Sequence, residues 1–323
     1  MFISLLVVSI IAFAIFQIVP GDPARMMSGA AATPQDIENM RQIWGLDRPA
    51  YEQYLIWLSH LFQGDLGKSI RFKVPVLDLI FERLPATLEL IIVSVIIASI
   101  IGVVLGVLSG ARKGGFLDRI FTTISFLGLA IPNFLWGLIF VIIFGAILKI
   151  LPVSGRLEIG VDVAGITGFM MLDSILTLNI GGFLVAIRHL ILPSVALALG
   201  LIAIIQRTLA SSMVDVMTKD YILTDRIKGL SEKKIILVRA LKNAFIPTLT
   251  IVGAQFAFLI GGSTLIELIF GWPGVGTLAF IAVQWKDIPV IQGIVFIYAL
   301  IVVFVSLIID LVYSFLNPKI RFG

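Results

Sequence analysis

Long uncharged, apolar runs alternate with short charged segments along this chain of 323 residues. A helix needs about 20 apolar residues to cross the hydrocarbon core of a bilayer. Six stretches meet or approach this requirement: Met1–Val19, Leu90–Gly110, Ile120–Leu148, Leu190–Gln206, Asn243–Ile266 and Ile288–Phe315. Each is expected to form one span, although Pro132 lies inside the third and Pro247 in the first turns of the fifth. The pattern therefore predicts an all-α membrane protein with six transmembrane helices.

The spans divide the chain into three parts. Residues 1–19 are expected to form the first transmembrane helix, residues 20–86 a large extracytoplasmic loop, and residues 87–323 a core of five helices with a charged loop at 211–243. Because the first span has no basic leader and no A-x-A-type cleavage site, we expect a retained anchor rather than a signal peptide. A further uncharged piece, Ser174–Ile187, is short for a span at 14 residues and is expected to be interfacial or re-entrant.

Lysine and arginine residues predict the orientation, because cytoplasmic loops carry an excess of them. With both termini inside, the inner segments hold 13 basic and 5 acidic residues, and the outer segments hold 11 basic and 14 acidic ones. Asp310, the remaining acidic residue, lies near the inner end of the last span and is expected to snorkel to the interface. We therefore expect a multi-pass protein of the cell (cytoplasmic) membrane with its N- and C-termini inside.

The first outer loop shows signals of two short helices. Thr33 is expected to cap a helix over Gln35–Trp44, with Pro34 at its first position. Tyr51–Phe62 is expected to form a second helix with an aromatic face. The loop is interpreted either as a lid over the outer mouth or as a docking surface for an extracytoplasmic protein, and the two roles are compatible.

Composition excludes several classes of protein. Hydrophobic residues make up 59% and charged residues 14% of the chain, whereas a soluble domain has roughly 25% charged residues. The chain has no cysteine, and His60 and His189 are too few for a histidine-rich metal site. Gly64–Ser69 is similar to the end of a phosphate-binding loop, but Phe62 stands where that motif needs its first glycine. We expect no catalytic, metal or nucleotide site in this chain.

The charged run Tyr221–Asn243 has the pattern of a helical hairpin between two spans. Asp220 at the start and Lys228 at the end of a first helix suit the helix dipole, and Gly229 can end it in a left-handed conformation. Ser231 can cap the next helix. Composition leaves two interpretations open: an ordered surface for a soluble partner, or a basic loop held by anionic lipid headgroups.

The run Tyr221–Ser231 (YILTDRIKGLS), followed by Ala240–Pro247 (ALKNAFIP), resembles the coupling loop of binding-protein-dependent ABC importer permeases. The resemblance is greatest to the peptide/nickel branch, and to the first of the two permeases in dipeptide and oligopeptide importers. Further matches follow in order along nearly the whole chain: Pro20–Pro23, Gly64–Ser69, Arg83–Leu90, Leu151–Gly155 and Phe270–Gly276. Each match is weak alone, and together they are highly specific.

The resemblance implies a type I ABC importer permease fold in which two permeases form a pathway for short peptides. It implies as partners a second homologous permease, expected to be a paralogue, two ATPase subunits and an extracytoplasmic substrate-binding protein. ATP and Mg would bind to the ATPases, with no cofactor and no nucleic acid bound by this chain. Nickel or another small solute is the alternative cargo. An ion-coupled carrier, the alternative class, predicts acidic residues at the midplane, which these spans nearly lack.

The resemblance also assigns a coupling helix that lies in a groove of an ATPase subunit. Its residues are Tyr221, Thr224, Asp225, Arg226, Lys228, Gly229, Leu230 and Ser231. Family members commonly have a small residue at the positions of Asp225 and Ile227, so this chain departs from the pattern there. We expect Asp225 to pair with a basic residue of the ATPase instead.

Polar and small residues inside the predicted spans suggest two further roles. Polar groups are costly to bury against lipid, so the candidates for lining the pathway are Asn133, Gln255, Ser263 and Thr264. Glu267 and Trp272, at the outer end of the fifth span, are expected to form an outer gate. Gly102, Gly106 and Gly110 form a small-residue face that predicts close helix packing within or between subunits.

Overall fold

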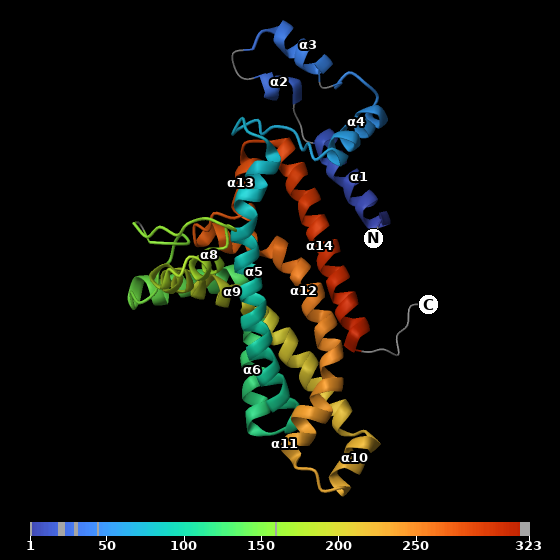
Figure 1. Ribbon diagram of the computed structural model, residues 1–323, viewed down its shortest axis with the longest axis vertical. Helices are drawn as coiled ribbons and strands as arrows, with labels where there is room; N and C mark the ends of the chain where they lie inside the picture. The colour runs from blue at the N-terminus through green and yellow to red at the C-terminus, as the bar shows by residue number, and fades with distance from the viewer. Residues whose placement is uncertain (1, 19–22, 29–31, 44, 159, 317–323) are drawn as a thin grey trace. The chain divides into compact units, whose positions relative to one another are not determined.

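The computed structural model describes residues 2–18, 23–28, 32–43, 45–158 and 160–316. In this part the regular secondary structure consists of helices, joined by loops, and one isolated β-bridge, Lys68–Pro75 (Figure 1). The helices are α1 (Phe2–Ile18), α2 (Pro23–Ser28), α3 (Pro34–Ile43), α4 (Ala50–Phe62), α5 (Val76–Ala111), α6 (Phe116–Ala130), α7 (Asn133–Phe140), the π-helix η1 (Val141–Ile147), α8 (Met170–Leu176), α9 (Ile180–Met217), α10 (Asp220–Ile227), α11 (Glu232–Lys234), the π-helix η2 (Ile235–Ala240), α12 (Leu241–Ile269), α13 (Val275–Gln284) and α14 (Ile288–Leu316). The predicted all-α class is confirmed.

Four helical stretches in the described part are long and apolar enough to cross a membrane: Val76–Ala111, Ile180–Met217, Glu232–Ile269 and Ile288–Val312. The pair formed by α6 and α7–η1 would make a fifth if it counts as one span. The first predicted span corresponds to α1, which has 17 residues. Val19, the first three residues of the Pro20–Pro23 motif and Trp44 lie outside the described residues.

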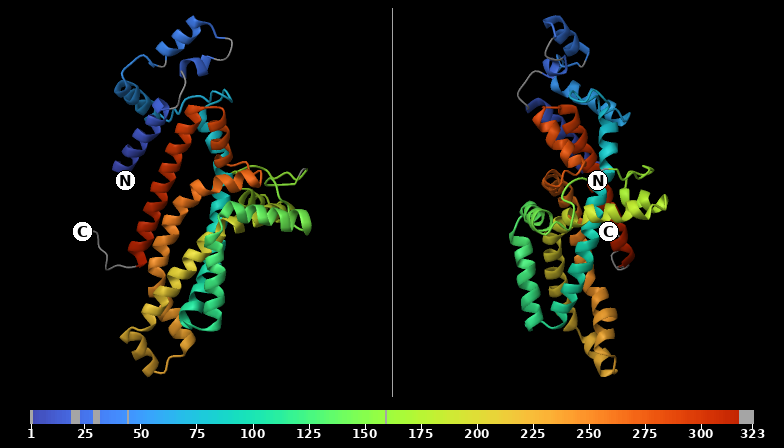
Figure 2. Two further views of the ribbon diagram at one scale, coloured as in Figure 1. Left: turned by 180° about the vertical axis from the view of Figure 1, so that it is seen from behind. Right: turned by 90° about the vertical axis from the view of Figure 1, so that its left-hand side faces the viewer.

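The predicted span Ile120–Leu148 is broken near Pro132 into two helices. The segment forms α6 and α7–η1, which meet at an angle of 99°, and the second helix leaves the first sideways (Figure 2). Ile131 is extended at φ −95°, ψ 125°, as expected for a residue whose helical conformation clashes with a following proline ring. Pro85, Pro193 and Pro247 lie within α5, α9 and α12 and do not end them.

The uncharged piece Ser174–Ile187 is divided between two helices. Its first residues end α8, and Leu178 reverses the chain in a left-handed conformation at φ 53°. Asn179 then caps α9 by accepting a hydrogen bond from the Gly182 amide at 2.8 Å. Residues 180–187 are therefore the first turns of the 38-residue α9.

Two compact units make up the chain, and the first comprises Met1–Leu84 and Leu278–Val303. The predicted cap of α3 is confirmed, because the Thr33 hydroxyl accepts a hydrogen bond from the Asp36 amide at 3.2 Å. The aromatic face of α4 packs on α1, where the Phe13 ring lies 5.5 Å from the Tyr54 ring and 6.1 Å from the Trp57 ring.

The second unit comprises Pro85–Thr277 and Phe304–Gly323, and α9 is its centre. α9 packs against α6, α7, α8 and α12. The predicted glycine face of α5 also lies against α9: a Cβ atom at Gly102, Gly106 or Gly110 would come within 2.5–2.9 Å of Ile205, Leu209 or Met213. The Gln206 amide donates to the Ser109 hydroxyl at 3.0 Å across the same contact. Small residues here let two helix backbones approach closely, so the glycine face packs within the chain.

Candidate functional site

The charged hairpin after α9 folds as its sequence predicts. α10 begins at Asp220, ends at Ile227 and is followed by Lys228. Gly229 has φ +76°, the left-handed conformation that glycine adopts without a Cβ penalty. Ser231 precedes α11 at the N-cap position, but its side chain makes no capping hydrogen bond. The backbone of the turn is therefore as expected, and only the predicted side-chain cap is wrong.

One fully buried side chain anchors α10 to the helices above it. Ile222 is buried in a cluster with Val107 of α5, Leu209 and Met213 of α9, Ile235 and Ala240 of η2, and Ala244 of α12. Burying an isoleucine side chain contributes roughly 1.5–3 kcal/mol. Since packed interiors transmit displacement rather than absorb it, a movement of α10 would act on the ends of α5, α9 and α12.

Three polar contacts tie the hairpin together. The Asn243 side-chain amide donates to the Tyr221 hydroxyl at 3.0 Å. Asp225 pairs with Arg239 at 3.3 Å, and Arg226 donates to the Glu232 carboxylate at 2.8 Å. Asp225, expected to pair with a partner's basic residue, thus pairs within the chain. Exposed pairs are individually weak, so these contacts orient α10 while Ile222 holds it.

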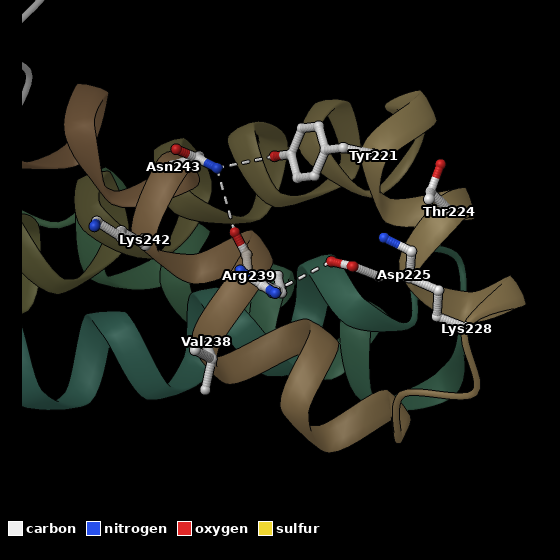
Figure 3. Close-up of a pocket in the computed structure, with 8 residues that line it drawn as sticks. All are labelled: Tyr221, Thr224, Asp225, Lys228, Val238, Arg239, Lys242 and Asn243. Carbon is white, nitrogen blue, oxygen red and sulfur yellow. Dashed lines mark hydrogen bonds and ion pairs between the residues drawn. The ribbon is translucent and has the colours of Figure 1, made fainter.

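The outer face of α10 combines exposed apolar residues with a polar groove. Leu223 is 57% and Ile227 80% exposed, and their i, i+4 spacing places them on one side of the helix. Beside them lies a groove of about 430 Å³ between α10 and the η2–α12 segment (Figure 3). It is lined by Tyr221, Thr224, Asp225, Lys228, Val238, Arg239, Lys242 and Asn243. The predicted set omitted Leu223, Arg239 and Asn243, although the Leu223–Ile227 spacing was visible in the sequence.

A second cluster, here called the buried network, surrounds Glu267 at the end of α12. The fully buried Glu267 carboxylate accepts hydrogen bonds from the Thr87 hydroxyl at 2.8 Å, the Thr277 amide at 2.9 Å and the Ser263 hydroxyl at 3.3 Å. The Trp272 indole donates to the Ala86 carbonyl at 2.8 Å. The network therefore joins the end of α12 to α5 and to the start of α13, with both predicted gate residues in it.

The other predicted pathway residues lie apart from this network or at its edge. Thr264 is half-buried, and a Cβ atom at Gly276 would lie 2.7 Å from its Cα atom. Asn133 begins α7 and donates to the Leu197 carbonyl of α9 at 3.5 Å. Gln255 is half-buried on α12. The structure thus brings Ser263, Glu267 and Trp272 together and leaves Asn133 and Gln255 outside the group.

A buried ion pair holds the segment between Arg156 and α8, and the sequence did not predict it. Arg156 donates to the Glu89 carboxylate at 2.5 Å and to the Gly168 carbonyl at 2.9 Å. Its guanidinium carbon lies 5.6 Å from the centre of the Trp272 ring. The available signal was Glu89 itself, a lone charge directly before the uncharged run of α5.

Asp173 of α8 holds the same segment through four hydrogen bonds. The Thr167 amide and hydroxyl and the Ile166 and Gly168 amides all donate to its carboxylate at 2.6–3.2 Å. Desolvation raises the pKa of Asp173, but these hydrogen bonds together outweigh it and hold the pKa below its usual value. The segment is therefore ordered around an ionised carboxylate.

Models of one protein family match this chain over nearly its whole length. Residues 102–322 match the family described as "Binding-protein-dependent transport system inner membrane component", and residues 1–91 match its N-terminal counterpart. The chain is 39% identical to the di/tripeptide transport system permease protein DppB of Pseudomonas aeruginosa, over 97% of this chain and 94% of that protein. It is 36% identical to the dipeptide transport system permease protein DppB of Escherichia coli, over the same shares of 97% and 94%.

Among solved structures, the fold is similar to that of a chain of the MetNI methionine ABC transporter in an inward facing conformation. The TM-score is 0.53 at 16% sequence identity, over 72% of this chain and 93% of that chain. At this identity the likeness concerns the fold alone.

Proposed function

Since the chain belongs to the family of binding-protein-dependent transport system inner membrane components, we propose that it is the permease subunit of an ATP-driven ABC importer and forms half of a pathway for short peptides. The two relatives named above are permeases of dipeptide and di/tripeptide transport systems, and they align over nearly the full length of this chain. The chain has no catalytic role in this proposal, and ATP and Mg bind to partner ATPase subunits.

The observation that carries the proposal is the division of α10 into an anchored face and an exposed face. Ile222 holds the helix on the ends of α5, α9 and α12, while Leu223 and Ile227 present exposed apolar surface. Apolar groups in a polar surrounding are typical of a protein–protein contact. α10 is thus the coupling helix, and Leu223 and Ile227 enter the groove of an ATPase subunit with Lys228, Gly229, Leu230 and Ser231 at the turn.

The mechanism is rigid-body gating through this contact. Closure of the two ATPases on ATP displaces α10, and the packed cluster around Ile222 carries the displacement to the long helices. The pathway then opens to the outside, where a binding protein delivers the peptide. A paralogous permease supplies the other half of the pathway.

The same proposal completes the membrane topology with six spans. α1, of 17 residues, is about 26 Å long at 1.5 Å per residue and nearly matches the ~30 Å hydrocarbon core. The α6–α7–η1 pair counts as one broken span, so that both termini and α10 lie on the cytoplasmic side. The excess of basic over acidic residues in the inner segments supports this orientation.

Pathway residues follow from the same helices. Asn133 and Gln255, half-buried outside the buried network, line the peptide path with Thr264. Ser263, Glu267 and Trp272 hold the outer end of α12, and the outer gate opens when this network moves as a unit. Substrate choice belongs largely to the binding protein.

A capture experiment tests the proposal. The tagged chain is purified from its own membrane in mild detergent, and bound proteins are identified by mass spectrometry. We expect a second permease and two ATPase subunits with the parent chain, and loss of the ATPases alone with Leu223→Asp/Ile227→Asp. Leu178→Asp is the matched control, because Leu178 is 86% exposed and outside the hairpin. Purification of the parent chain without any ATPase, under conditions that keep other ABC complexes intact, would refute the proposal.

A further inference from the structure

A short, highly ordered segment precedes α5 and has no part in the coupling described above. Residues 67–76 form a tight reversal in which the Ser69 amide donates to the Val74 carbonyl at 2.9 Å and the Val76 amide to the Gly67 carbonyl at 3.0 Å. It contains the end of the Gly64–Ser69 motif, which resembles but does not complete a phosphate-binding loop. Figure 1 shows it at the start of α5, beside the turn between α13 and α14.

A buried carboxylate joins this reversal to that turn. Asp287, fully buried, accepts hydrogen bonds from the Ser69 hydroxyl and from the Ile70 and Arg71 amides, the last two at 3.0 Å. Arg71 also places its guanidinium 4.0 Å from the centre of the Trp285 ring, although Trp285 itself is 56% exposed. The two segments therefore form one rigid surface.

Four exposed cations lie on this surface. We call the set the basic patch, and its members are Lys68, Arg71, Lys73 and Lys286, of which Arg71 packs on the Trp285 ring. Within the described part of the chain, none of the four charged side-chain groups forms an ion pair with a carboxylate. Asp287 cannot neutralise them at the surface, because it is buried and already accepts three hydrogen bonds.

The backbone adds an independent observation. Lys73 and Lys286 adopt φ values of +60° and +53°, a conformation in which glycine would avoid the Cβ penalty that lysine incurs. Glycine can therefore replace either lysine without straining the backbone, which makes these two cations removable at little risk to the fold.

The position of the patch on the helices favours a protein partner over lipid. α5 begins directly after it and carries Asp78, Glu82 and Arg83 in its first eight residues, which span about 12 Å of charged helix at 1.5 Å per residue. The first turns of α14 pack against this charged part: Ile288, Val290 and Ile294 are buried, and a Cβ atom at Gly293 would lie 2.6 Å from Val76. Charged turns beside the patch extend beyond the hydrocarbon of a bilayer.

We propose that the basic patch binds an acidic face of the extracytoplasmic substrate-binding protein, with Trp285 as its central apolar contact. This proposal rests on the proposed function, since the importer assignment supplies such a partner on that side. An exposed tryptophan ring with an arginine packed on it, and exposed lysines on the same two segments, has the composition of a protein-binding surface. Its charges raise the rate of association with an acidic protein and select against a basic one.

The test uses the intact complex of permeases and ATPases in nanodiscs of phosphatidylcholine. The ligand is the purified binding protein whose addition stimulates ATP hydrolysis by that complex, and affinity is measured by biolayer interferometry at low and high salt. The variant Lys73→Gly/Lys286→Gly removes two cations and relieves both strained turns, so the fold is retained. Lys149→Gly is the matched control, because Lys149 is an exposed lysine at φ +54° in the other compact unit.

We expect the double glycine variant to weaken binding roughly threefold to tenfold, with most of the difference lost at high salt. The control should bind as the parent does. Adding Lys68→Glu and Arg71→Glu should weaken binding further, while both ATPases still co-purify. Unchanged affinity in the double glycine variant with intact ATPases would overturn this proposal and leave the importer assignment standing. Absence of the ATPases from the parent complex would instead overturn the proposed function.

Two further measurements bear on the identity of the partner. A photo-crosslinker at Val74, which is 40% exposed, should form a product with the binding protein. If instead the variants alter binding of the complex to phosphatidylglycerol vesicles, and no crosslink to the binding protein forms, the surface is a lipid contact and the proposal is wrong.

Discussion

Replacing Arg156 by methionine tests whether the buried ion pair holds the segment before α8. The side chains of Arg156 and Glu89 are 9% and 4% exposed, and the substitution removes the bonds to Glu89 and to the Gly168 carbonyl. The Glu89 carboxylate is left buried with the Met171 amide still donating to it at 2.8 Å. Removing one partner of a buried pair costs about 3–5 kcal/mol, because the other charge is left uncompensated. We expect the free energy needed to open this segment locally to fall by that amount.

The absence of cysteine from the chain makes this opening measurable. Val163, within the segment, is 6% exposed, and a Cβ atom at Gly182 of α9 would lie 2.7 Å from its side chain. In a Val163→Cys background the rate of thiol labelling follows the open population of the segment. A cost of about 3 kcal/mol raises that population more than 100-fold, and the labelling rate should rise accordingly until it reaches the rate of a free thiol.

Two comparisons make the result decisive. Arg188→Met is the matched control, since the exposed Arg188 also donates to a backbone carbonyl, that of Ile150, at 3.3 Å, and should change labelling little. Adding Glu89→Gln to Arg156→Met removes the uncompensated charge and should slow labelling again. Labelling within about twofold of the parent would refute the argument, because the expected cost corresponds to a rise of more than about 100-fold. Equal rates in the single and double variants would show that the buried charge is not the cause.

Three more outcomes are expected. Gly106→Leu should prevent assembly of a monodisperse complex in size-exclusion chromatography, because a Cβ atom there would lie 2.9 Å from Leu209. Ile222→Ala, which removes about 2–5 kcal/mol of packing, should lower peptide uptake per ATP hydrolysed in proteoliposomes. Because the pKa of Asp173 is lowered in the folded state, its ionised carboxylate stabilises the fold above about pH 4, the ordinary pKa of an aspartate. This contribution to stability is lost as pH falls through the folded-state pKa. Hydrogen exchange of the Thr167 amide, corrected for intrinsic rates, should therefore rise on acidification, and already at neutral pH in Asp173→Asn.

Local signals in the sequence predicted the hairpin and the helix packing well. Gly229 and the charges of α10 define a short helix and its end without reference to the rest of the fold. The spacing of Gly102, Gly106 and Gly110 likewise defines one helix face. Such features depend on the φ preference of glycine and on helical period, which are properties of a few neighbouring residues.

The prolines show a feature that neighbouring residues alone do not predict, namely whether a helix bends. Pro132 bends its segment by 99°, whereas Pro85, Pro193 and Pro247 leave their helices continuous. Whether a helix continues past a proline therefore depends on the surrounding structure rather than on the residue type alone. Glu89 and Arg156 were missed for a similar reason, since they are 67 residues apart and meet only in the folded chain.

In the proposed coupling helix α10, different residues face the partner and the membrane helices. Leu223 and Ile227 are exposed and would contact the ATPase, while the buried Ile222 packs against the membrane helices. Partner preference and mechanical stiffness can therefore change independently within eight residues. Under this proposal, altering Leu223 and Ile227 alone could let the permease bind an ATPase from another importer. The displacement of α10 would still reach the membrane helices through Ile222.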